Sequence, residues 1–299
     1  MATRWNTALH SVSYAGFWHG QARLTLDAFL EKASALGYDG VMLMAKRPHL
    51  SVLDFDADAR GRLKDRLEAL DLTPVCLAGY TDFCTGTEHP EIPSREMQIL
   101  YVAELARLAR DIGCSMIRVF TGYTGTGASF DQNWNWCVDA LRESSRRAAD
   151  FGVTLGVQNH HDTAVHHDSL SDLLAEIDQP NCRAMFDAWA PALQGCDLAE
   201  AVRRMAPQMV HTTVADYVRR PRYSYVPPLV NYVREVDAIR AVPMGEGFID
   251  YRGFFRALAD AGYAGYVAYE MCSPLRGGGS EANLDRCART FLEYMAHVE

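Results

Sequence analysis

Short apolar, β-branched runs alternate with longer segments of helical periodicity along the whole chain, and the alternation repeats eight times. Short apolar runs predict buried strands, and apolar positions three or four residues apart predict helices that pack on one face. We predict strands at 7–13, 40–46, 74–80, 116–122, 154–158, 183–187, 209–214 and 266–270. We predict helices at 24–36, 58–70, 94–112, 133–151, 169–177, 198–205, 251–259 and 281–296.

Eight strand–helix units in 299 residues favour one (β/α)8 TIM barrel of the α/β class over a doubly wound open sheet. A dinucleotide-binding open sheet carries a glycine-rich phosphate turn after its first strand, but this chain has "HSVSYAGFWHGQ" there. With 48% hydrophobic residues, the chain can bury one large core. We therefore predict a single barrel domain over residues 1–299.

One connection, near 215–245, is much longer than the others and is rich in Arg, Tyr and Pro. Connections of this length are usually functional lids or interaction surfaces. We predict a loop that covers or flanks the site, with contact to a neighbouring subunit as the alternative.

Charge and cysteine usage exclude several classes of protein. The net charge is −9 and the basic residues are scattered, which argues against a nucleic-acid partner. The eight cysteines contain no CxxC pair and predict reduced thiols. No apolar run of about 18 residues and no leader pattern is present, so we expect a soluble, cytoplasmic protein without a membrane partner.

Metal-capable side chains stand near the ends of four consecutive predicted strands. They are Gln158 in "LGVQ", Asp187 in "AMFD", His211 in "MVH" and Glu270 in "VAYE". In a barrel, these ends meet at one mouth, where catalytic residues are found. A mixed oxygen and nitrogen ligand set suits Mn²⁺, Mg²⁺ or Co²⁺. Each residue alone is more commonly a loop anchor, but four together predict a site.

The pieces "GVQNHHD", "CRAMFDAW", "MVHTTVADY", "PMGEGFIDYRGFF" and "GYVAYEMC" span the second half of the chain. In this half the chain resembles the xylose isomerase-like TIM-barrel superfamily, the sugar phosphate isomerase/epimerase group. The resemblance implies that Gln158, Asp187, His211 and Glu270 hold a divalent metal, Mn²⁺ first and Mg²⁺ or Co²⁺ as alternatives. The family's strand-five ligand is usually the glutamate of an "ENH" signature. Glutamine can coordinate through its oxygen but cannot accept a proton.

The family commonly moves a proton with two metal-bound glutamates, of which only Glu270 has a counterpart here. His160 is our candidate for the second proton-transfer group, because imidazole titrates near neutral pH. Strand alternation would turn His161 away from the site, unless the strand has already ended. We therefore predict Glu270 and His160 as catalytic residues.

Further strand-end residues are candidates for substrate binding, with solvated loop charge or core packing as the alternative for each. They are Lys46, His10, Glu246, Trp189 and Tyr217. Glu246 lies between two glycines that allow close backbone approach. We expect His166 and His167, which precede a helix, to face solvent.

The sequence predicts a divalent-metal-dependent isomerase or epimerase that acts on a keto sugar or cyclitol through a metal-stabilised enediolate. The alternative is a metal-dependent lyase on 3-keto sugars, either C-glycoside deglycosidase-like or a dehydratase, because elimination needs one base and one acid. A third alternative is a non-catalytic sugar-binding barrel or partner subunit. The expected partners are a small carbohydrate and a second copy or partner subunit.

Overall fold

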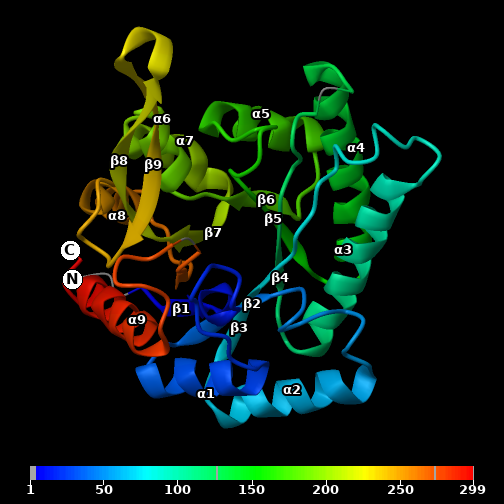
Figure 1. The fold of residues 1–299 in the computed structure, drawn as a ribbon. Coiled ribbons are helices and arrows are strands. Elements are labelled where there is room, and N and C mark those ends of the chain that lie inside the picture. Colours follow the sequence, from blue (N-terminus) through cyan, green and yellow to red (C-terminus); the bar gives the residue numbers. More distant parts are fainter. Residues whose placement is uncertain (1–4, 126, 273, 299) are drawn as a thin grey trace.

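Eight parallel strands close into a barrel in the order β1-β10-β7-β6-β5-β4-β3-β2 (Figure 1). The computed structural model describes residues 5–125, 127–272 and 274–298. The barrel strands are β1 (Thr7–His10), β2 (Gly40–Met44), β3 (Thr73–Ala78), β4 (Met116–Val119), β5 (Thr154–Gln158), β6 (Cys182–Met185), β7 (Met209–Val214) and β10 (Val267–Tyr269). The predicted (β/α)8 barrel is confirmed.

The helices surround the barrel and follow the predicted segments closely. They are α1 (Leu26–Leu36), α2 (Ala57–Ala69), α3 (Ser94–Asp111), α4 (Phe130–Ala149), α5 (His167–Ile177), α6 (Trp189–Gln194), α7 (Leu198–Met205), α8 (Tyr251–Asp260) and α9 (Glu281–Ala296). Helix α4 begins earlier than predicted because Ser129 and Gln132 form a reciprocal cap at its start. Helix α6 was not predicted, since six residues are too few to display a helical period.

Side chains that point into the barrel form two layers. The lower layer is apolar and fully buried and includes Ala8, Met42, Cys76, Met185 and Ala268. Two residues farther along each strand, the side chain returns to the same face. On three of these strands the upper layer is polar and places His10, Asp187 and Glu270 near the barrel mouth, whereas Met44 and Ala78 on β2 and β3 are apolar. The strand period thus delivers polar groups to the carboxyl ends of the strands.

The long connection is a β-hairpin, whereas we predicted a loop near 215–245. Strand β8 (Asp216–Val226) pairs antiparallel with β9 (Asn231–Val242) across the short 3-10 turn Pro227–Leu229. The β-branched and aromatic residues of this segment favour paired strands. The hairpin extends away from the barrel (Figure 1, yellow), and only its base is buried, at Asp216, Tyr217, Ala241 and Val242.

All eight cysteines are free, as predicted, and six of them are buried. Within the described ranges, no helix is both long enough and apolar enough to cross a bilayer.

Candidate active site

A cavity of about 430 Å³ opens at the carboxyl ends of the barrel strands. Polar and aromatic side chains line it, among them His10, Tyr80, Arg118, Phe120, Gln158, His160, His161, Glu270 and Cys272. Three of the residues predicted from the sequence as metal ligands or catalytic groups, Gln158, His160 and Glu270, therefore share one cavity. Asp187 and His211 are buried close to it but are not part of its lining.

Gln158 lies between a cation and an anion. Its Oε1 accepts a 2.9 Å hydrogen bond from Nη1 of Arg118, and its Nε2 donates to Oδ2 of Asp187. The amide orientation therefore follows from its neighbours. A glutamate at this position would place a second carboxylate against Asp187, whereas the amide supplies a donor to Asp187 and an acceptor to Arg118. This is a physical reason for glutamine at the end of β5.

Asp187 is held by β7 as well as by Gln158. The backbone N–H of Thr213 donates to Oδ1 of Asp187 over 2.8 Å, and the Thr213 hydroxyl donates to Oδ2 over 2.7 Å. Burial raises the pKa of Asp187 to about 6, and the hydrogen bonds from Thr213 and Gln158 oppose that shift. Asp187 is therefore a buried acceptor that anchors strands β5 and β7 to each other.

Glu270 follows β10 directly and lines the cavity. Its Oε2 lies 3.9 Å from Nε2 of His10, and its Oε1 accepts a 3.3 Å hydrogen bond from Sγ of Cys272. The hydroxyl of Tyr217 lies 3.5 Å from the same sulfur. Burial, and secondly the charge of Asp187, raises the pKa of Glu270 to about 7. A carboxyl that gains and loses its proton near neutral pH is suited to general acid–base catalysis.

His160 and His161 both line the cavity, because β5 ends at Gln158 and strand alternation stops there. His161 has a positive φ of 66°, which turns its ring back toward the ring of His160. The backbone N–H of His161 donates to Nδ1 of His160 over 2.8 Å, so neutral His160 carries its proton on Nε2. Burial, with Arg118 adding to it, lowers the pKa of His160 to about 4. This arrangement favours a hydrogen-bond donor over the base that we predicted.

The structure brings only part of the predicted four-ligand metal set together, namely Gln158 and Asp187. In favour of a ligand role, Nε2 of His211 is buried and has no hydrogen-bond partner among the described residues. However, the ligand atoms of Asp187, His211 and Glu270, all in the described part of the chain, do not lie within 4.8 Å of one another. Beside Asp187 stands Thr213 instead of His211.

The amide oxygen of Gln158 already has a partner in this structure. Its Oε1, the atom that would bind a cation, faces the guanidinium of Arg118. A fixed positive charge at this place repels a second cation. The physical reason for the difference from the sequence prediction is the side chain of β4, which the strand-end pattern did not include.

Arg118 is the site residue that the sequence prediction missed. It is buried on β4, with its guanidinium 3.8 Å from the ring centre of Phe120 and 4.8 Å from that of Tyr80. Its Nε is buried and has no hydrogen-bond partner among the described residues. The available signal was the two-residue alternation from Met116 to Arg118, because a charged side chain inside an apolar strand is rare unless it is paired.

Four of the five predicted substrate-binding residues line the cavity or contact residues that line it. They are His10, Lys46, Trp189 and Tyr217. His10 lines the cavity, and Lys46 places its Nζ 3.7 Å from the ring centre of the lining residue Tyr80. The indole of Trp189 lies 5.9 Å from the ring of His160 and 5.4 Å from that of Tyr217.

Glu246 does not belong to the site. It is exposed and pairs with Arg276 over 2.6 Å. The glycines on either side serve the turn itself. Gly245 adopts a φ of 87°, and a Cβ on Gly247 would overlap the carboxylate of Asp216. The close backbone approach that we inferred from the glycines is therefore real, but its partner is the protein.

Comparisons with known proteins agree with this architecture. Fructoselysine 3-epimerase of Escherichia coli O157:H7 is 22% identical over 263 residues, which cover 85% of this chain and 88% of that protein. D-psicose 3-epimerase from Clostridium cellulolyticum H10, solved with D-tagatose, has a TM-score of 0.75 at 18% identity and covers 98% of this chain and 99% of that chain. The probable 3-DHS dehydratase of Bacillus anthracis has a TM-score of 0.75 at 16% identity and covers 98% and 100%.

The family model described as xylose isomerase-like TIM barrel matches residues 30–291. This range begins within α1 and ends within α9, so it includes seven of the eight barrel strands and most of the cavity lining, with His10 of β1 outside it. The chain belongs to the xylose isomerase-like TIM barrel family.

Proposed function

We propose that this protein is an isomerase or epimerase that moves a proton at the carbon next to the carbonyl of a keto sugar or cyclitol. The similar proteins named above include epimerases and a dehydratase. The observation that carries the proposal is the shared cavity of Glu270, a carboxyl with a pKa of about 7, and the buried cation Arg118. Glu270 takes the proton, and Arg118 binds the oxygen on which negative charge develops.

In this mechanism the substrate carbonyl oxygen lies against the guanidinium of Arg118, which lines the cavity, and against Nε2–H of His160. Deprotonated Glu270 takes the proton from the adjacent carbon, and the electron pair moves onto the carbonyl oxygen. Donors already fixed around that oxygen stabilise the charge without reorganising. Return of this proton by Glu270 to the neighbouring carbon, with transfer of the hydroxyl proton between the two oxygens, gives the isomer. The epimer forms when water delivers a proton to the opposite face of the carbon and Glu270 loses its proton to solvent.

The metal-dependent form of this reaction stays the alternative that the family resemblance supports. Gln158, Asp187, His211 and Glu270 would be the ligands, and Mn²⁺, Mg²⁺ or Co²⁺ the ion. Metal analysis of the purified protein, together with activity before and after chelation, separates the two. Activity that persists after complete metal removal supports Arg118 as the cation of the site, and activity that returns only with added Mn²⁺ contradicts it.

Elimination from a 3-keto sugar is the second candidate function. It is favoured by the pairing of one base, Glu270, which would remove the proton, with the Nε2–H of His160, which would protonate the leaving oxygen. The similar proteins named above include both an epimerase and a dehydratase.

A substrate panel in D₂O tests both functions. Ketoses, inososes and 3-keto glycosides are incubated with the protein and with Glu270→Gln. Deuterium at carbon with an isomeric product supports the first function, and release of water or an aglycone supports elimination. Absence of both with every substrate would contradict an enzymatic role and favour the non-catalytic sugar-binding barrel.

We also propose that the protein works in the reducing cytoplasm, which its eight free thiols support.

We propose, further, that a second copy of this chain packs on the hairpin. Seven large apolar side chains are exposed there: Tyr223, Tyr225, Leu229, Val230, Tyr232, Val233 and Val236. Apolar clusters of this kind mark interaction sites. Residues 219–240 contain five arginines and two acids, whereas the chain carries a net charge of −9, so the hairpin complements the surface of another copy.

A further inference from the structure

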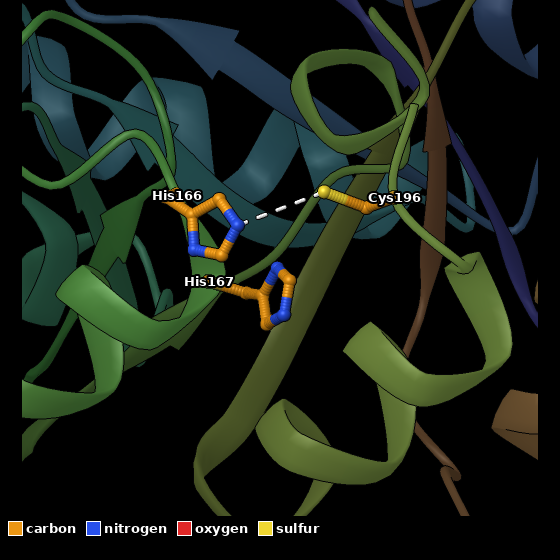
Figure 2. A group of neighbouring side chains, drawn as sticks. All are labelled: His166, His167 and Cys196. Atoms are coloured by element: carbon orange, nitrogen blue, oxygen red, sulfur yellow. Dashed lines mark hydrogen bonds between the residues drawn. The ribbon is translucent and has the colours of Figure 1, made fainter. Parts of the chain in front are cut away.

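Two histidines and a cysteine come together outside the cavity, on two different connections of the barrel (Figure 2). His166 caps the start of α5, His167 is its first residue, and Cys196 lies between α6 and α7. One ligand atom from each side chain lies within 4.8 Å of the other two. We expected both histidines to face solvent. That is wrong for His167, which is buried.

We propose that His166, His167 and Cys196 bind a zinc ion. Thiolate sulfur and imidazole nitrogen are the ligands that Zn²⁺ takes in proteins, and its usual geometry is tetrahedral. Two such ligands on one tetrahedral ion, with Zn–S near 2.3 Å and Zn–N near 2.05 Å, lie about 3.6 Å apart. Nε2 of His166 and Sγ of Cys196 are 3.7 Å apart. This pair is already spaced as two ligands of one ion.

The third proposed ligand is a ring nitrogen of His167. Nδ1 of His167 is buried and has no hydrogen-bond partner among the described residues. Figure 2 shows one ring nitrogen of His167 turned toward the His166–Cys196 pair. The other nitrogen, Nε2, lies 4.0 Å from Oδ1 of Asp168, so we infer that Nδ1 is the one that faces the pair. A buried nitrogen without a partner is costly in a folded protein unless a ligand satisfies it.

The carboxylate of Asp168 lies beside both rings, where it can accept a proton from either. Its Oδ2 is 3.8 Å from Nδ1 of His166, and its Oδ1 is 4.0 Å from Nε2 of His167. A carboxylate beside the distal nitrogen of a metal-bound histidine fixes the tautomer and strengthens the ligand. On zinc binding, Nδ1 of His166 would carry the ring proton and donate it to Asp168, in place of the 3.2 Å bond that it now accepts from the Asp168 backbone N–H.

The ion would join two segments that border the active site. The connection from β5 to α5 carries His160 and His161, and the connection from β6 to α7 carries Trp189, which contacts His160. Three protein ligands leave a fourth position for water.

Cobalt substitution tests the site, because a Co²⁺–thiolate bond gives a charge-transfer absorption that nitrogen and oxygen ligands do not. The chelator-treated full-length protein is titrated with Co²⁺ and with Zn²⁺, and uptake is counted by native mass spectrometry. We expect one ion per chain and a thiolate band that is lost in Cys196→Ser. Asp168→Asn should weaken binding about 10- to 100-fold.

Cys272→Ala is the matched control, since Cys272 is the other partly exposed thiol and lies at the barrel mouth. The thiolate band should persist in this variant. A band that disappears in Cys272→Ala and persists in Cys196→Ser overturns the proposal, as does a wild-type protein that takes up no ion or shows no band. Zn²⁺ should also raise the melting temperature of the wild type and leave that of Cys196→Ser unchanged.

Discussion

Nη1 of Arg118 donates a 2.9 Å hydrogen bond to Oε1 of Gln158, and both side chains are buried in the mouth of the barrel. The bond joins β4 to β5 and places a permanent positive charge where the family resemblance predicted a metal ion. Arg118 and Gln158 are therefore the residues whose substitution distinguishes the two forms of the proposed reaction.

Arg118→Met should lower kcat by about 100- to 1,000-fold, which is the usual effect of losing a donor to a developing oxyanion. Arg118→Lys keeps the charge and loses the planar fork, and should recover only part of that loss. Kinetics on a substrate found in the D₂O panel measure both variants. A kcat that is unchanged in Arg118→Met would contradict a role for this residue in the reaction.

Gln158→Glu should destabilise the protein at pH 8 and much less at pH 5. Above its pKa the new carboxylate repels Asp187, whereas protonation at lower pH restores a donor to the same oxygen. Urea unfolding at the two pH values measures the difference. Gln158→Met, which removes the amide without adding charge, is the control and should show no such dependence on pH.

The value of kcat/KM should rise with pH up to about 7 and level off above it. Glu270 accepts a proton only when it is deprotonated, and burial raises its pKa to about 7, so the active form becomes rarer as the pH falls. Glu270→Gln should abolish exchange at carbon while ligand binding is retained. A profile that is flat from pH 5 to 8 in the wild type would contradict the assignment of Glu270 as the base.

The free energy of unfolding should rise between pH 4 and 6.5. Burial lowers the pKa of His160 to about 4, of His161 to about 3 and of His211 to about 4, so at pH 5 the unfolded chain binds protons on these rings that the folded chain does not.

Two carboxyls oppose this trend. Burial raises the pKa of Asp187 to about 6 and that of Glu270 to about 7 in the folded protein. The protonated carboxyls therefore favour the folded state at low pH, and this stabilisation is lost as the pH rises through those values. Urea unfolding from pH 4 to 8 measures the sum. Glu270→Gln should steepen the rise and His160→Asn should flatten it, and the opposite order would show that other groups dominate.

Val230→Asp combined with Val236→Asp should reduce the oligomeric state. Both valines are among the most exposed apolar side chains, and a charge at either position would remain unpaired in an apolar interface. Light scattering after gel filtration gives the mass of each form. Leu53→Asp, a change at an equally exposed leucine outside the hairpin, is the control. A wild-type protein that is monomeric at all concentrations would contradict the proposed contact.

The barrel could be predicted from the sequence because each strand and helix has its own local period. Residues at strand ends, such as Gln158 and Glu270, could also be predicted, since the carboxyl ends of all barrel strands meet at one mouth. The role of Gln158 could not be predicted from the sequence. It depends on Arg118, a partner on β4 that is known only once the pairing of the strands is known. The same holds for Thr213, whose backbone N–H and hydroxyl donate to Asp187.

The hairpin and the His166–His167–Cys196 cluster were missed for a different reason. The hairpin has strand-forming residues but lacks a buried face along most of its length, so its apolar pattern looks irregular. The cluster joins residues about 30 positions apart through a loop whose course no local signal specifies.

The amide of Gln158 couples its own replacement to that of Arg118, because it accepts a hydrogen bond from Arg118 and donates one to Asp187. Exchange of Gln158 alone for an acid sets two anions side by side, and exchange of Arg118 alone leaves the amide oxygen without its donor. Replacement of one of these two residues before the other would thus pass through a destabilised intermediate, so positions 118 and 158 are expected to change together when such barrels diverge.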